Sequence, residues 1–331
     1  MPDRKPGPSL PSTILVTGGA GFIGSHVCER LLEQGHAVRC LDNLATGKRD
    51  NLAHLRREER FSFVEGDICD LSALGKAMKG ASAVIHLAAL GSVPRSIAKP
   101  LDSERANLTG FLSMLETARA AGAKRIVYAS SSSVYGDSTA LPKKEGSEGH
   151  ALSPYAVTKA INEVYAGLYH RLFGLETIGL RFFNIFGERQ DPEGAYAAAI
   201  PKFIRALLRH ESPVIHGDGM QTRDFTYVKN AVQAVEEALA APPSAAGEVY
   251  NIAYGERCNL LELLQKMQER LARIDPATAG IPPDHGPERK GDVRDSMADI
   301  TKAREQLGYV PRYSLDEGLD KAIPWYAEHW K

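Results

Sequence analysis

The chain has 331 residues, enough for one large domain or two fused domains with an extensive core. Its 40 basic and 41 acidic residues nearly cancel, so the net charge is −1. No broad basic field is present to hold nucleic acid or an anionic membrane surface, and we expect neither partner. An anionic ligand must instead be bound by a few well-placed groups.

The N-terminal segment 1–11 is polar and rich in proline, and it lacks the apolar core of a signal peptide, so we expect a flexible tail. No apolar run approaches the ~18 residues that a membrane-spanning helix needs. The cysteines form no CxxC pair and the histidines show no metal-ligand spacing, which favours a reduced, cytoplasmic protein without a metal site. The cysteines are Cys28, Cys40, Cys69 and Cys258.

Short β-branched or apolar runs alternate with helical patterns through the first half of the chain. The first helix is predicted over 22–34, where Phe22, Ile23, Val27 and Leu31 repeat at helical spacing before Gly35. This alternation predicts an α/β fold, a doubly wound, Rossmann-like parallel sheet with helices on both faces. The predicted strands are 13–17, 37–41, 61–64, 83–87, 125–129 and 177–182.

After Asn184 the alternation ends and proline and glycine become frequent. Helices are predicted over 200–209, 230–240 and 260–272, a strand over 249–252 that returns to the first sheet, and a loop over 275–291. We therefore expect a nucleotide-binding domain over 12–183 and a smaller, partly interleaved substrate-binding lobe over 184–331.

A glycine-rich segment, 17–24, lies between the first predicted strand and the first predicted helix. Glycines at this point allow a tight turn and a close approach of backbone to a pyrophosphate, which then faces the N-terminus of the helix. The flanking strand and helix make this motif more specific than a glycine triplet alone. It predicts a dinucleotide site that includes Gly18, Gly21, Phe22, Ile23 and Gly24.

Asp42 ends the second predicted strand, 18 residues after Gly24, where a carboxylate can hold the hydroxyls of the adenosine ribose. That carboxylate would repel a 2′-phosphate, so NAD is favoured over NADP. Lys48 and Arg49 follow closely and leave NADP open. Asp67, at the end of the third predicted strand, could reach the adenine edge.

Tyr155 and Lys159 lie one turn apart on a helix that Ser153 can cap and Pro154 can begin. A free tyrosine is a poor base at neutral pH, because its pKa is about 10. The Lys159 cation, together with a positive nicotinamide ring, would favour the phenolate and supply a general base for a sugar hydroxyl. Lys159 could also hold the nicotinamide ribose.

A third catalytic group is expected at the end of the strand over 125–129, where four serines follow one another. Ser131 and Ser132 are the best placed to share the proton of the reacting oxygen. Tyr165 and Tyr169 on the same helix as Tyr155 show that tyrosine is common there. The prediction therefore depends on the combination of this pair with the glycine loop and the serine strand end.

Together these motifs resemble the extended short-chain dehydrogenase/reductase family from about residue 12 to the C-terminus. The resemblance implies that Asn43, Ile68, Ala88, Asn107 and Lys159 also hold the cofactor. It further implies a homodimer formed through a four-helix bundle of helices around 107–121 and 154–172. The motifs are the glycine loop, Asp42-Asn43, His86-Leu-Ala-Ala89, the serine run ending in Val134-Tyr-Gly136, Tyr155-xxx-Lys159 and Arg181-Phe-Phe-Asn-Ile-Phe-Gly187.

The second half resembles the UDP-sugar enzymes of that family. Asn184, Arg223, Arg289 and Asp292 fall in segments that would grip the diphosphate and the uridine of such a substrate. Two arginines suit a diphosphate because the guanidinium fork pairs bidentately with phosphate oxygens.

Three segments, 89–96, 191–198 and 291–299, are most similar to 4-epimerases of UDP-N-acetylglucosamine. The mechanism implied is a hidden redox cycle at C4 through a 4-keto sugar, with UDP-GlcNAc and UDP-GalNAc as the interconverted pair. The resemblance also implies that Ser296 occupies the position of a wall beside the sugar C2. Its small side chain, with Gly91 and Ser92, would leave room for an acetamido group.

Three other kinds of function are alternatives: a 4,6-dehydratase, an enzyme acting on another UDP-sugar, and a non-catalytic NAD sensor. A 4,6-dehydratase of this family usually has an Asp-Glu pair after the catalytic hydroxyl, where this chain has Ser132 and Ser133. An epimerase of UDP-glucose, or an epimerase or decarboxylase of a UDP-uronic acid, remains possible, since Arg95 could meet a carboxylate. A non-catalytic NAD sensor would be expected to lose Tyr155 or Lys159, and this chain keeps both.

Overall fold

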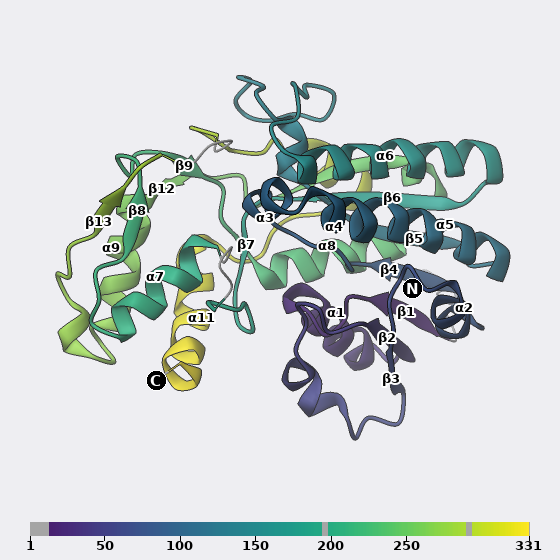
Figure 1. Ribbon diagram of the computed structural model, residues 1–331, viewed down its shortest axis with the longest axis horizontal. Coiled ribbons are helices and arrows are strands. Elements are labelled where there is room, and N and C mark those ends of the chain that lie inside the picture. Colours follow the sequence, from purple (N-terminus) through teal and green to yellow (C-terminus); the bar gives the residue numbers. More distant parts are fainter. Residues whose placement is uncertain (1–12, 194–197, 289–292, 331) are drawn as a thin grey trace, which may run out of the picture.

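The structure is a computed structural model that describes residues 13–193, 198–288 and 293–330. A seven-stranded, all-parallel sheet forms the larger part of the molecule, and a smaller lobe lies beside it (Figure 1). The strand order is β11-β6-β5-β4-β1-β2-β3, which confirms the predicted doubly wound fold. The strands are β1 Ile14–Thr17, β2 Val38–Asp42, β3 Phe61–Glu65, β4 Ala83–His86, β5 Arg125–Ser131, β6 Glu176–Phe182 and β11 Glu248–Ile252.

Helices cover both faces of this sheet, because alternate strand residues point to opposite sides. In β1, Ile14 and Val16 join one buried cluster and Leu15 joins the other. The first cluster packs against α1 Phe22–Glu33, α8 Val228–Ala240 and α10 Thr301–Leu307. The second packs against α2 Leu71–Met78, α5 Gly110–Ala121 and α6 Pro154–Phe173.

The strand order reverses between β1 and β4, and a crevice opens there at the carboxyl ends of the strands. The two strands are parallel, with Thr17 opposite His86, and the Thr17 hydroxyl lies 2.8 Å from Nδ1 of His86. Ligands of doubly wound folds bind at such a switch point, so the topology places a site immediately beyond Thr17 and His86.

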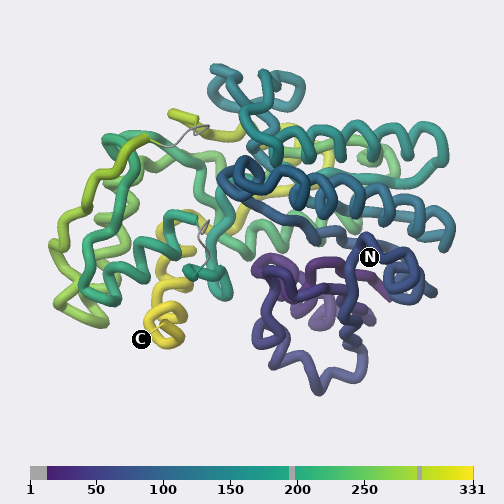
Figure 2. The backbone as a smooth tube through the Cα atoms, viewed as in Figure 1, coloured from purple at the N-terminus to yellow at the C-terminus, as the bar shows by residue number. Residues whose placement is uncertain are grey.

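The smaller lobe is built on α7 Ala199–Leu208, α9 Leu260–Leu271 and α11 Leu315–His329, which share one buried cluster. Figure 2 shows green and yellow segments of the second half running back among the blue and teal parts of the first. These returning segments include β11, which pairs with β6 in parallel. Short pairs join parts of the lobe and its junction: β7 Ile185–Phe186 with β10 Thr226–Tyr227, β8 Val214–His216 with β13 Asp284–Gly286, and β9 Thr222–Arg223 with β12 Cys258–Asn259.

The prediction of a plain loop over 275–291 was wrong, because this segment contains β13 and a 3-10 turn, Pro276–Thr278. The strand has only three residues, one of them glycine, and its single pairing partner is 70 positions earlier in β8. A local pattern cannot reveal such a pairing. The remaining elements are α3 Val93–Ala98, α4 Pro100–Glu104, a π turn Arg105–Thr109, and 3-10 turns Arg49–Leu55, Ser132–Tyr135 and Pro243–Ala245.

Within the described ranges, no helix combines the length and apolar character needed to span a bilayer. The same ranges contain no group of three or more His, Cys, Asp or Glu side chains placed to hold a metal ion.

We expect Phe111→Ala to destabilise the sheet domain strongly. The ring is fully buried on α5 and packs edge-on against His86 at 5.4 Å and Tyr128 at 5.2 Å between centroids. Loss of such a ring costs about 3–5 kcal/mol in the free energy of unfolding, measurable by urea titration. The control Leu71→Ala, at a residue 63% exposed, should change it by about 0.5 kcal/mol or less. Equal losses in the two variants would contradict this packing.

Candidate active site

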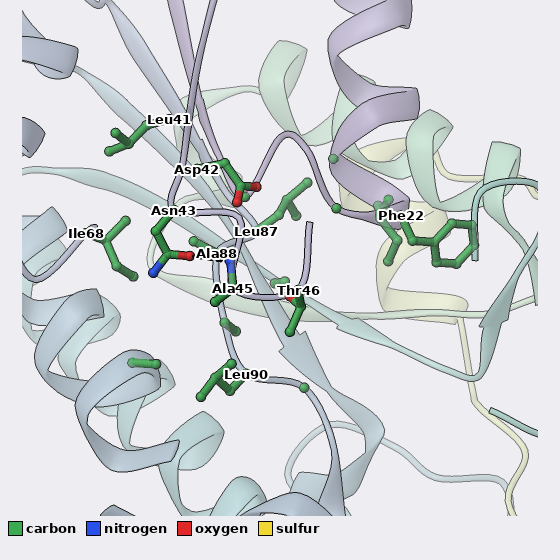
Figure 3. A pocket seen from close by; sticks show the side chains of 18 of the residues that line it. Phe22, Leu41, Asp42, Asn43, Ala45, Thr46, Ile68, Leu87, Ala88 and Leu90 are labelled. Carbon is green, nitrogen blue, oxygen red and sulfur yellow. Dashed lines mark hydrogen bonds between the residues drawn. The ribbon is translucent and has the colours of Figure 1, made fainter. Parts of the chain in front are cut away.

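A cavity of about 630 Å³ lies at the carboxyl edge of the sheet, at the predicted switch point. Much of its wall is formed by residues that end or follow β1, β2, β3, β4 and β5. Figure 3 shows the part that comes from β2, from the segments after β3 and β4, and from the start of α1. The glycine loop lines one part of this cavity, and Tyr155 and Lys159 line another. A dinucleotide site and a candidate acid/base site therefore share one space.

The glycine loop packs against neighbouring backbone too closely for a side chain at Gly18 or Gly24. Gly18 has a φ of 73°, and a Cβ there would lie 2.6 Å from the backbone nitrogen of Ala88. A Cβ on Gly24 would lie 2.1 Å from the carbonyl oxygen of Gly18. Gly21, Phe22 and Ile23 line the cavity at the start of α1, and no side chain among the described residues caps this helix. Its first N–H groups can therefore face an anion.

Asp42 is fixed at the cavity wall by two backbone hydrogen bonds. The nitrogen of Ala20 donates to Oδ2 at 2.9 Å and that of Leu44 donates to Oδ1 at 2.8 Å. Burial raises the pKa of Asp42, and these two N–H donors oppose that shift. Each carboxylate oxygen retains a lone pair for a ribose hydroxyl, as the sequence predicts.

The two cations that left NADP open have partners of their own. Lys48 lies 3.1 Å from Asp191, and Arg49 pairs with Glu65 and sits 5.0 Å from the centre of the Phe63 ring. Neither side chain lines the cavity, whereas Asp42 does.

Beyond Asp42, the end of β3 supplies the next part of the wall. The Asn43 amide donates to Asp67 at 3.3 Å, and the Cys69 nitrogen donates to the other Asp67 oxygen at 2.8 Å. Burial alone would raise the pKa of Asp67, but these hydrogen bonds lower it. Asn43, Ile68 and Ala88 all border the cavity here (Figure 3).

Tyr155, Lys159 and Ser131 meet at the other part of the cavity. Helix α6 begins as predicted, with the Ser153 hydroxyl accepting from the Ala156 nitrogen at 3.2 Å. The Lys159 ammonium donates to the Ala129 carbonyl at 2.8 Å and lies 5.9 Å from the centre of the Tyr155 ring. The Ser131 hydroxyl hydrogen-bonds the Tyr155 hydroxyl.

The electrostatics of the protein alone favour the neutral forms of Tyr155 and Lys159. Burial raises the pKa of Tyr155, opposed by the hydrogen bond from Ser131. Burial also lowers the pKa of Lys159 to about 8, opposed by Glu163. The predicted phenolate depends on the positive nicotinamide ring as well as on Lys159, and that ring belongs to the cofactor. A phenolate here needs additional positive charge in the cavity.

Two predicted site residues lie behind the wall instead of in it. The Asn107 side chain is buried, accepts from the Leu90 nitrogen at 2.7 Å and donates to the Leu90 carbonyl at 3.2 Å and to Thr158 at 3.3 Å. It joins the loop after β4 to the catalytic helix. Ser132 begins a 3-10 turn, and it is not among the residues that border the cavity.

The predicted substrate residues are distributed around the mouth. Gly91 lines the cavity, while Ser92 caps α3 by accepting from the Arg95 nitrogen at 3.2 Å. Asn184 has a φ of 37° and donates to the Asp224 carbonyl at 3.1 Å. Ser92 and Asn184 therefore do not border the cavity, whereas Gly91 does.

Arg223 and Ser296 are neighbours across a short pairing. The Arg223 guanidinium donates to the Arg294 carbonyl at 3.1 Å, and the Ser296 nitrogen donates to the Thr222 carbonyl at 3.2 Å. Arg289 and Asp292 lie outside the described residues.

Some lining residues were not anticipated from the sequence. A group from α4 and the π turn borders the cavity, and Gln190 enters from the segment after β7. The π turn overlaps the start of the helix around 107–121 that the family resemblance implies, and it was not anticipated from the sequence. The unanticipated residues include Ala45, Thr46, Asp102, Arg105, Ala106, Phe182, Ile185 and Gln190.

Comparison with known proteins covers nearly the whole chain. The family model described as GDP-mannose 4,6 dehydratase matches residues 15–322. The UDP-glucose 4-epimerase of Mycolicibacterium smegmatis is 37% identical over 314 residues, covering 94% of this chain and 97% of that protein.

Two solved structures extend this likeness to three dimensions. A UDP-N-acetylglucosamine 4-epimerase from Methanobrevibacter ruminantium M1, in complex with UDP-N-acetylmuramic acid, superposes with a TM-score of 0.90 at 36% identity, covering 97% of this chain and 99% of that one. A UDP-glucuronic acid 4-epimerase from Bacillus cereus, in complex with UDP-glucuronic acid and NAD, superposes with a TM-score of 0.87 at 32% identity. That comparison covers 96% of this chain and 99% of the Bacillus cereus chain. The chain therefore belongs to the GDP-mannose 4,6 dehydratase family, among the extended short-chain dehydrogenases/reductases that its motifs resemble.

Proposed function

We propose that the protein is an NAD-dependent 4-epimerase of UDP-N-acetylhexosamines, interconverting UDP-GlcNAc and UDP-GalNAc through a transient 4-keto sugar. The observation that carries this proposal is the shared cavity. It is bordered by the glycine loop and Asp42 on one side and by Tyr155, Lys159 and Ser131 on the other. A hydride acceptor and a sugar hydroxyl can therefore meet beside an acid/base group.

The residues present fit NAD. The Gly18 and Gly24 positions allow backbone to approach a pyrophosphate, and Asp42 offers acceptors for ribose hydroxyls. Lys48 and Arg49, which could have favoured a 2′-phosphate, are paired elsewhere. The Bacillus cereus relative is solved with NAD, which supports the same choice here. Bound NAD would supply a hydride acceptor at C4 and a positive ring near Tyr155.

The chain's own groups would then move the proton. Tyr155 takes the proton of the sugar 4-hydroxyl and returns it after the keto sugar has turned over. Ser131 holds the reacting oxygen through its hydroxyl, and Lys159 adds positive charge beside the phenolate. Because the cycle returns the hydride to the sugar, the cofactor need not leave the protein.

Selectivity for the acetamido group would come from Ser296 and its rigid backbone. The segment around it is clamped by a hydrogen bond from the Lys143 nitrogen to the Met297 carbonyl at 2.7 Å and one from the Ala298 nitrogen to the Asp224 carboxylate at 3.2 Å. A small side chain on such a segment leaves space that a large one would fill. The relative that binds UDP-N-acetylmuramic acid, a 2-acetamido sugar, supports this assignment.

UDP-glucose or UDP-glucuronate is the second candidate substrate, because relatives with those names match the chain equally broadly. Dehydration is less well supported. The carboxylates that line the cavity, Asp42, Asp67 and Asp102, come from other elements than the strand end that carries Ser131. Ser132 and Ser133 follow that residue and supply hydroxyls instead of an acid and a base.

A homodimer stays part of the proposal. Helix α6 exposes apolar side chains, with Val164 69% and Leu172 63% exposed, and Leu101 on α4 is 80% exposed. Helices α4, α5 and α6 pack in one layer, so a second copy could cover this face and complete a four-helix bundle.

We expect the purified protein to carry tightly bound NAD, because the cycle is closed and the glycine loop and Asp42 together offer many contacts. Denaturation, followed by an enzymatic assay of the supernatant, measures the nucleotide. Recovery of NADP, or of no nucleotide from a protein that added NAD does not activate, would contradict the cofactor assignment.

Tyr155→Phe keeps the ring and removes the acid/base hydroxyl. Turnover should fall roughly 10²–10⁴-fold, the usual contribution of a general base, while the Kd for UDP-sugar, measured by calorimetry, changes little. Near-normal turnover in this variant would show that another group moves the proton.

Sugar selectivity is tested with UDP-GlcNAc, UDP-glucose and UDP-glucuronate, each followed to its C4 epimer. We expect the acetamido sugar to be turned over best. Ser296→Tyr should abolish that activity and spare the non-acetylated pair, because a steric clash discriminates without altering the chemistry. Ser296→Ala is the matched control and should keep the original preference. If the tyrosine variant epimerised UDP-GlcNAc at the wild-type rate, Ser296 would not be the wall.

A further inference from the structure

Glu163 lies one turn beyond Lys159 on α6, and its side chain is only 12% exposed. Oε1 accepts a hydrogen bond from the Ser130 hydroxyl and another from Nε of Arg181 at 2.9 Å. Oε2 accepts from Nη2 of Arg181 at 2.7 Å. The carboxylate therefore joins the catalytic helix to two neighbouring strands, β5 and β6.

The hydrogen bond from Ser130 to Glu163 lies next in the chain to the residues that contact Tyr155 and Lys159. Ser130 directly precedes Ser131, whose hydroxyl bonds Tyr155. The residue before Ser130 is Ala129, whose carbonyl accepts from the Lys159 ammonium at 2.8 Å. Glu163 thus holds the short stretch of β5 that places both the serine and the lysine.

Lys159 is almost fully buried among few charges. On its own helix it faces Tyr155 and Glu163. From β4 it faces His86, which stays neutral because burial and the lysine lower its pKa to about 3. On β6, Arg181 pairs with the same Glu163 and also with Glu148. From α4 and the π turn, Asp102 and Arg105 border the cavity that Lys159 lines. Glu163 is the carboxylate whose charge opposes the effect of burial on the lysine.

We propose that Glu163 is a positioning residue of the reaction, the counter-charge that keeps buried Lys159 protonated while it fixes the strand end carrying Ser131. This inference rests on the role assigned to Lys159 in the proposed function. Without the Glu163 charge, buried Lys159 would lose the carboxylate that opposes its desolvation, and Arg181 would keep Glu148, which is partly exposed. Loss of a buried counter-charge favours the neutral form of an amine.

Loss of the Glu163 charge would lower catalysis because it favours the neutral form of Lys159. A neutral Lys159 gives Tyr155 no help in reaching the phenolate, whose formation burial already opposes. Activity that depends on the lysine cation is therefore lost as the pH rises through the pKa of Lys159, which is about 8 in the wild-type protein. Removing the Glu163 charge should move that loss to lower pH.

Glu163→Gln tests the proposal in the full-length protein, since glutamine keeps the shape and one acceptor but no charge. The ¹³Cε shift of Lys159, assigned with Lys159→Arg, reports the protonation of the lysine directly during a pH titration. We expect its midpoint to fall by about one unit, a roughly tenfold weaker proton affinity. The alkaline limb of kcat against pH should move down by the same amount. An unchanged midpoint would overturn the proposal, even if turnover fell.

Glu148→Gln is the matched control, because it removes the other carboxylate on Arg181 without touching Lys159. It should lower the Tm in a similar way and leave the lysine midpoint in place. Equal shifts in both variants would reduce Glu163 to a structural role. Glu163→Asp keeps the charge, so the midpoint of the Lys159 titration should return at least in part toward the wild-type value. This variant also provides the test if Glu163→Gln does not fold. The NMR titration is informative even if no UDP-sugar is epimerised, so failure of the proposed function is recognised separately.

Discussion

The close approach of three backbone segments at the glycine loop is the constraint on which the site depends. Gly18 lies against the backbone of Ala88, at the end of β4, and Gly24 lies against Gly18 itself. Because none of these contacts leaves room for a Cβ, helix α1 can start directly at the edge of the sheet. The N-terminus of that helix, the ends of β1 and β4, and the Asp42 carboxylate then surround one cavity. A side chain at Gly18 or Gly24 would push apart the elements that surround this cavity.

The catalytic end of the cavity has the opposite physical character. Its groups are held by polar contacts in a largely desolvated setting, where burial raises the pKa of Tyr155 and lowers that of Lys159. Both shifts favour the neutral forms of the two side chains. In the protein alone, the Tyr155 phenolate and the Lys159 ammonium of the proposed reaction are therefore disfavoured. The positive nicotinamide ring and the Glu163 carboxylate act in the other direction. In the proposed function, ionisation of Tyr155 and Lys159 would therefore depend on occupation of the cofactor site.

The sequence predicted the elements of the sheet to within one or two residues, because each is a short apolar run bounded by glycine or a polar residue. The residues predicted for the cofactor from Gly18 to Asp67 line one cavity, since they lie at the ends of strands or at the start of α1. Asn107, predicted at the cofactor, lies in the π turn, does not border the cavity and bonds Leu90 and Thr158, contacts that form only in the folded chain. The partners of Glu163 could not be foreseen either, since Ser130 and Arg181 meet it only once β5 and β6 are paired.

The pairing of β11 with β6 has a consequence for how the chain reaches this structure. The sheet is completed by a strand that lies about 70 residues later, after the chain has passed through part of the smaller lobe. During synthesis from the N-terminus, β6 would expose an unpaired edge until Ile252 has left the ribosome. Completion of the seven-stranded sheet therefore waits for the part of the smaller lobe that precedes β11 in the chain. Truncation between the two would yield an aggregation-prone fragment instead of an isolated domain.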